Sequence, residues 1–236
     1  MLPEAVGAEV GDFIKQLREF KSGTGPGPTG LRVQFIKEMV GEEGDDPCVE
    51  AIFRVVMLFV EGKAPRYLQR WYAGGTLVGI EKDDLPLDED ARPIVIGESF
   101  RRIAGKIALL GDKERLGGWL KPSQVAVGVK AGSEVMVHSL RQWWERNRDN
   151  TSYVLLKMDY ANAFNEAEPQ AFLGTARRHL SGAAKMAYWC YGRSVNLVYN
   201  GRVLESHRGQ QGCPLMMPLF CGMKKEMRDR VDGMGM

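Results

Sequence analysis

Apolar positions in the first part of the chain repeat with a helical period. In residues 4–21, hydrophobic side chains recur every three or four positions, which predicts an amphipathic helix. Residues 48–61 are strongly apolar and are also predicted to be helical. A cluster of glycine, proline, serine and threonine at 22–30 cannot continue a helix, and it separates the first helix from another expected over 31–39. This part of the protein is therefore predicted to be mainly helical.

Strand-like patterns begin further along the chain. Apolar runs at 76–80 and 93–96 flank an acidic loop and predict a β-hairpin. The apolar run at 153–158 predicts a buried strand. Asn200 and Gly201 separate two alternating runs, and this dipeptide is a strong signal for a two-residue hairpin turn. Further helices are expected at 98–110, 132–148, 166–180, 182–191 and 214–230.

The order of these elements predicts the fold class. Helices come first and are followed by mixed strands and helices, which is typical of an α+β protein. The 236 residues suit one sizeable domain or two small ones, and a hydrophobic content of 44% is enough to form a buried core.

Several classes of protein are disfavoured by the sequence. No apolar run reaches the length of a membrane helix, and the first residues lack the basic start and apolar stretch of a secretion signal. The 4 cysteines form no Cys-x-x-Cys pair, so free thiols are expected rather than a zinc site. We expect an intracellular protein that is not secreted and has no membrane partner.

The charge is distributed unevenly along the chain. Residues 1–100 carry 11 Lys and Arg against 18 Asp and Glu, whereas residues 101–236 carry 21 against 12. A basic surface binds nucleic acid because Lys and Arg displace counterions from phosphates. A solvated basic face without a polyanion partner is the alternative interpretation.

Two blocks of residues are candidates for chemistry. In the first, Asp159 ends the strand expected at 153–158, and Phe164 follows five residues later, where one turn of chain can return it to the same cleft. In the second, Gly209 and Gly212 allow a ligand to approach the backbone closely, and Gln211 offers an amide to a sugar or a base. Alternatively, the first block is a helix cap and the second a turn before a helix.

Together, the two blocks carry a resemblance to a known family. Asp-x-x-x-Ala-Phe at 159–164, followed by Gln-Gly-x-Pro-Leu at 211–215, resembles the first and second palm motifs of reverse transcriptases, especially those of non-LTR retrotransposons. Four upstream segments resemble the corresponding fingers segments of that family in the same order. They lie at 25–31, 77–94, 101–103 and 124–134.

The resemblance implies a fold and a function. The fold would be the reverse-transcriptase-like fingers over 1–150 and an incomplete palm of a right-hand polymerase over 151–236. The implied activity is RNA-directed DNA polymerisation, with an RNA template, a DNA primer and deoxynucleoside triphosphates as partners. The resemblance also allows a nuclear location.

The resemblance gives individual residues their roles. Asp159 would be the catalytic ligand of Mg²⁺, an ion that prefers carboxylate and phosphate oxygens. The carbonyl of Tyr160 would assist it, and Phe164 would be the steric gate beside the ribose. The remaining nucleotide-binding residues would be Lys82 and Arg92, which contact the triphosphate, and Gln211 and Gly212, which form the pocket floor.

The match also has departures. In the family, an aromatic-x-Asp-Asp hairpin follows the second palm motif, and the residues after Phe220 contain no such hairpin. Asp229 and Asp232 lie in the right direction, but their spacing at a charged helix end favours solvated positions. Because one carboxylate cannot hold two metal ions in the geometry that nucleotidyl transfer requires, we expect that this polypeptide alone does not polymerise DNA. A non-catalytic domain that binds RNA or template–primer is the alternative.

Overall fold

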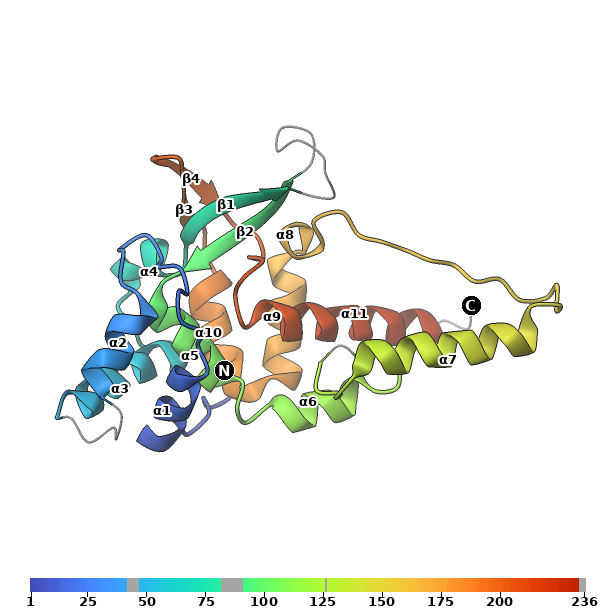
Figure 1. The fold of residues 1–236 in the computed structure, drawn as a ribbon, viewed down its shortest axis with the longest axis horizontal. Helices are drawn as coiled ribbons and strands as arrows, with labels where there is room; N and C mark the ends of the chain where they lie inside the picture. The colour runs from blue at the N-terminus through green and yellow to red at the C-terminus, as the bar shows by residue number, and fades with distance from the viewer. Residues whose placement is uncertain (42–46, 82–90, 126, 234–236) are drawn as a thin grey trace.

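The protein folds as a helical body with a small sheet at one side, and one helix and a long segment extend away from it (Figure 1). The computed structural model describes residues 1–41, 47–81, 91–125 and 127–233. The helices are α1 (Val10–Arg18), α2 (Val33–Val40), α3 (Cys48–Val60), α4 (Arg66–Tyr72), α5 (Ser99–Ala108), α6 (Lys113–Leu120), α7 (Gly132–Asn147), α8 (Ala163–Glu166), α9 (Pro169–His179), α10 (Ser181–Tyr191) and α11 (Met216–Gly233). The strands are β1 (Gly75–Glu81), β2 (Ala91–Gly97), β3 (Val195–Tyr199) and β4 (Arg202–Ser206).

The four strands form one sheet in the order β2-β1-β3-β4. β1 pairs antiparallel with β2 and parallel with β3, and β3 pairs antiparallel with β4. Both predicted hairpins are therefore confirmed. Asn200 and Gly201 have φ values of 48° and 72°, which is the left-handed conformation that a tight hairpin turn requires. The protein is α+β, as the order of elements predicted.

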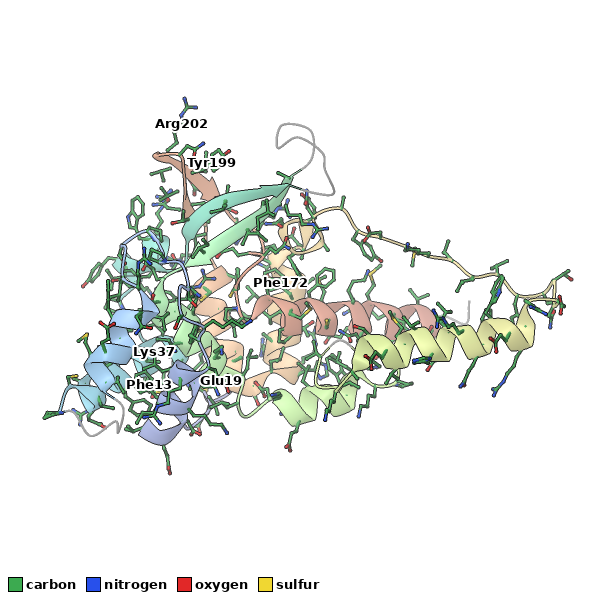
Figure 2. The ribbon with its side chains drawn as sticks, in the orientation of Figure 1. Phe13, Glu19, Lys37, Phe172, Tyr199 and Arg202 are labelled. Carbon is green, nitrogen blue, oxygen red and sulfur yellow. The ribbon has the colours of Figure 1, made fainter. Side chains whose placement is uncertain are left out.

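The core lies among the helices. α3 packs against α5, and α9 packs against both α10 and α11. One continuous cluster of buried apolar residues joins these helices, and Figure 2 labels two of its members, Phe13 and Phe172, inside the helical body. None of the helices within the described ranges is long and apolar enough to cross a membrane.

The strand predicted at 153–158 is wrong. This segment is extended but is in no strand, and its apolar side chains are exposed, with Val154 at 88% and Leu156 at 73% of full exposure. Figure 1 shows it as part of the long trace that runs from the end of α7 back to α8. An apolar run forms a buried strand only if a neighbouring strand is present to pair with it. None of the four described strands pairs with residues 153–158.

Helix α7 has the predicted length but not the expected burial. The sequence puts Val135, Leu140 and Trp143 on one apolar side of this helix, and such a side is usually buried. Of the residues in α7 only Gly132 is buried, while Val135 and Leu140 are exposed. Together, α7 and residues 153–158 present an apolar surface that no described part of the chain covers.

Candidate nucleotide and nucleic-acid site

The turn that contains Gln211 and Gly212 is bonded to the edge of the sheet. The carbonyl of Gln211 accepts a 2.7 Å hydrogen bond from the Val95 N–H, and Gln211 forms an isolated parallel bridge with Ile94. Gly212 has a φ of 107°, and a Cβ built on it would lie 2.5 Å from the Val95 carbonyl oxygen. Only glycine fits here, which explains why the backbone of the turn can lie directly on β2.

Arg92 lies on the same strand, two residues before Ile94. Side chains two positions apart in a strand point to the same face and are about 7 Å apart along it. Arg92 is exposed, and the side chain of Gln211 is half-buried. Within the described ranges neither side chain has a hydrogen-bond or ion-pair partner. A guanidinium and an amide are therefore both available to a ligand at this edge of the sheet.

Phe164 approaches the same turn from α8. Its carbonyl oxygen faces Gly209 so closely that a Cβ on this glycine would lie 2.1 Å from it. The side-chain amide of Asn165 donates a 3.4 Å hydrogen bond to the Gly209 carbonyl. The ring of Phe164 stands edge-on to Phe220 of α11, with centroids 5.2 Å apart. These contacts hold the half-buried Phe164 ring between the turn and α11.

A buried arginine of α5 is hydrogen-bonded to the turn that contains Gln211. Arg101 of α5 donates to Gln210 Oε1 over 2.6 Å and to the Gly74 carbonyl over 3.0 Å. The Gln210 amide in turn donates to the Ala73 carbonyl over 2.9 Å. This network joins the start of β1 to the turn that carries Gln211.

The other contacts of Arg101 are also uncharged. Its guanidinium lies 3.4 Å from the Tyr191 hydroxyl and 3.4 Å from Cys213 Sγ, to which it donates. Burial raises the pKa of the nearby Cys190 thiol to about 11, although the positive charge of Arg101 opposes this. No carboxylate of the described residues forms an ion pair with Arg101, so its charge stays uncompensated beneath the turn.

Sequence reasoning included Arg101 in a matching segment but gave it no role. A signal was present, because Ala104, Gly105 and Ala108 follow it at the spacing of one helix face and all three are buried. An arginine on an otherwise small, apolar helix face indicates a buried charge with a specific set of acceptors.

Asp159 and Tyr160 lie further along α11. Both are exposed, and Asp159 Oδ1 accepts a 3.0 Å hydrogen bond from the Tyr160 N–H. Lys224 donates a 2.6 Å hydrogen bond to the Tyr160 hydroxyl, and its ammonium lies 4.1 Å from the ring centroid. Phe164 contacts Phe220, and Tyr160 contacts Lys224, which lies one helical turn further along α11. Tyr160 and Phe164 therefore contact successive turns of α11.

The structure thus brings together four of the seven predicted site residues. Arg92, Phe164, Gln211 and Gly212 gather around the turn at the β2 edge. Asp159 and Tyr160 lie along the adjoining helix, and Lys82 lies outside the described residues. No group of three or more His, Cys, Asp or Glu in the described ranges could hold a metal ion. Asp159 does not by itself complete a two-metal centre, and magnesium there stays a prediction.

Comparison with known proteins adds no family to this description. No protein-family model matches the chain, and no curated protein matches it.

Proposed function

We propose that the chain is part of a reverse transcriptase of retrotransposon type, an RNA-directed DNA polymerase whose nucleotide-binding edge is formed here. The observation that carries the proposal is the hydrogen-bonded contact of the Gln211–Gly212 turn with β2, two residues from Arg92. The proposed nucleotide contacts are Arg92, Phe164, Gln211 and Gly212.

The chemistry of this edge suits a nucleoside triphosphate. A free guanidinium binds phosphate oxygens with two parallel hydrogen bonds. The Gln211 amide, which has no partner among the described residues, can bond to a ribose hydroxyl or a base edge. Gly212 is exposed, and the backbone of Phe164 packs against Gly209 of the same turn. These groups bind and orient a nucleotide without further chemistry.

Nucleotidyl transfer would require metal ions, which activate the primer hydroxyl and stabilise the leaving pyrophosphate. Asp159 is the carboxylate that would hold such an ion. Because no other ligands gather with it among the described residues, we expect the chain alone to bind template–primer and nucleotide without extending the primer. A primer-extension assay with Mg²⁺ that gives robust synthesis would refute this expectation.

The binding test compares template–primer affinity with and without the complementary deoxynucleoside triphosphate, measured by fluorescence anisotropy. We expect the nucleotide to tighten binding in the wild type and Arg92→Gln to abolish the gain. A charge-assisted hydrogen bond contributes about 1.5–3 kcal/mol, which corresponds to roughly tenfold or more in affinity. Arg202→Gln, an exposed arginine at the tip of the other hairpin, is the matched control (Figure 2).

The alternative function is a non-catalytic domain that binds RNA or template–primer. The exposed position of Asp159, with no cluster of metal ligands among the described residues, favours it. In that case binding is sensitive to salt but indifferent to the nucleotide, and Arg92→Gln weakens it equally in both conditions. If the nucleotide tightens template–primer binding and this gain is lost in Arg92→Gln, the result favours the reverse transcriptase over the non-catalytic binding domain.

A further inference from the structure

The outward face of α4 carries two parallel pairs of side chains. Arg66 and Arg70 are four residues apart, as are Tyr67 and Trp71, so each pair forms a stripe along the helix. Tyr67 is 79% exposed and Trp71 is 47% exposed. Large aromatic side chains that are exposed to solvent and lie beside arginines are typical of a surface on which bases stack.

A basic pocket lies at the N-terminal end of this helix. It has a volume of about 610 Å³ and is bounded by residues 1–4, by the end of α3, by α4 and by the end of α10. Its cations are Arg66, Lys185 and Arg193, which have no acidic partner among the described residues. Of its two carboxylates, Glu61 pairs with Lys63 at 2.7 Å, which leaves Glu4 against the three cations.

The pocket wall also holds an unsatisfied amide. Gln69 of α4 is 7% exposed and lines the pocket, and its Nε2 has no hydrogen-bond partner in the described ranges. A buried amide donor without an acceptor is unfavourable by about 1–3 kcal/mol. The Nε2 atom is buried within the wall, so the groups of this pocket that are open to an anion are its three cations.

The elements that carry these groups are firmly held. Arg70 donates to Asn196 Oδ1 over 3.1 Å and pairs with Glu205 at 2.9 Å, which fixes α4 on β3 and β4. Trp189 donates to the Ala64 carbonyl over 2.9 Å and meets Phe59 edge-on at 5.2 Å. The pocket and the aromatic stripe therefore keep a fixed relation to each other.

We propose that α4 and the adjoining pocket bind single-stranded nucleic acid. A backbone phosphate enters the pocket between Arg66 and Arg193, while neighbouring bases stack on Tyr67 and Trp71. This surface is separate from the nucleotide-binding edge, because α4 packs on β3 whereas the Gln211 turn bonds to β2, at the far edge of the sheet (Figure 1). The inference holds whether or not that edge binds nucleotide.

The experiment measures binding of a fluorescein-labelled single-stranded oligouridylate to the full chain by anisotropy over a range of salt concentrations. We expect Arg66→Gln and Arg193→Gln each to lower the slope of log affinity against log salt by about 0.7, the value for one phosphate contact on a single strand. Tyr67→Ala and Trp71→Ala should each weaken binding at least about fivefold and leave the slope unchanged.

Matched controls come from the tip of the other hairpin. Arg202→Gln and Tyr199→Ala alter exposed side chains on either side of the β3–β4 turn (Figure 2), and both should bind as the wild type does. Thermal unfolding of each variant establishes that it remains folded. The proposal is overturned if the Arg66 and Arg193 variants match Arg202→Gln, or if a blunt duplex binds as tightly as the single strand. Loss of binding in Arg92→Gln alone would place the contact at the nucleotide edge instead.

Discussion

The guanidinium of Arg101 and the side-chain amide of Gln210 form a 2.6 Å hydrogen bond between α5 and the turn that precedes α11. The two residues are 109 positions apart in the chain. Because the Gln210 amide also reaches the Ala73 carbonyl, this pair fixes the turn to the start of β1. The placement of Gln211 on the edge of the sheet thus depends on a buried charge that no carboxylate of the described residues neutralises.

Replacing Arg101 should destabilise the protein and release the turn. Arg101→Met removes the charge but leaves the buried oxygens of Gly74 and Gln210 without a donor, at a cost of about 1–3 kcal/mol each. We expect a loss of about 2–4 kcal/mol in the free energy of unfolding, measured by urea denaturation, and faster amide exchange around Gln211. Arg54→Met, at an exposed arginine of α3 whose ion-pair partner among the described residues is Glu50, should change stability by less than about 0.5 kcal/mol.

Replacing Arg101 by lysine tests whether its guanidinium positions the Gln211 turn or only stabilises the fold. Lysine keeps the charge but cannot span the separate acceptors that the guanidinium fork reaches. Arg101→Lys should therefore recover part of the stability while amide exchange at Gln211 remains fast. Equal recovery of both quantities would contradict a specific role for the guanidinium in holding the turn.

Gly212 provides a second test of the same turn. An alanine there meets the Val95 carbonyl at 2.5 Å and must adopt a φ of 107°, so Gly212→Ala should destabilise the protein by about 1–3 kcal/mol. It should also weaken nucleotide binding, since the turn must move off β2. Gly118 in α6 is the control, because nothing lies within 4 Å of its added Cβ. Gly118→Ala should stabilise the protein by about 0.5–1 kcal/mol, as glycine-to-alanine changes in helices do.

The sequence could predict the features that depend on local chemistry. The turn of Asn200 and Gly201, the two hairpins and the glycine at position 212 each follow from residues close together in the chain. The acceptors of Arg101 could not be predicted, because they lie 27 to 112 residues away. The strand expected at 153–158 failed for a related reason. Its apolar run is compatible with burial, but burial depends on a partner strand that the described residues do not contain.

The exposed apolar surface of α7 and residues 153–158 should cause self-association. Val154, Leu156 and Met158 are exposed on the extended segment, and Leu140 is exposed on the helix. Exposed apolar side chains concentrated in this way favour association in water. We expect the sedimentation coefficient of the wild type to rise with concentration, and the double variant Val154→Ser, Leu156→Ser to sediment as a monomer.

A control for this prediction is Val203→Ser, an exposed valine on β4. If association is due to α7 and the extended segment, this variant should behave as the wild type does. A wild type that remains monomeric throughout the concentration range, with no binding of a hydrophobic dye, would show that this surface is covered in solution.

Glu226 should make stability depend on pH. Partial burial tends to raise the pKa of its carboxyl, but hydrogen bonds from Arg178 and Thr175 outweigh this and lower it. The two donors lie on α9, with Arg178 at 2.6 Å and Thr175 at 2.8 Å, and His179 Nε2 lies 3.1 Å from the same carboxylate. The carboxylate therefore joins α11 to α9 in its ionised form.

The sign follows from the direction of this shift. Because the pKa of Glu226 is lower in the folded state, its contribution to stability is present above the unfolded value of about 4.3 and is lost as the pH falls through the folded value. Glu226→Gln should lower the thermal midpoint at pH 7 and flatten its fall between about pH 5 and pH 3. Glu145→Gln, an exposed glutamate on α7 without an ion-pair partner among the described residues, should leave both unchanged. An equally steep fall in Glu226→Gln and the wild type would assign the acid sensitivity to other carboxylates.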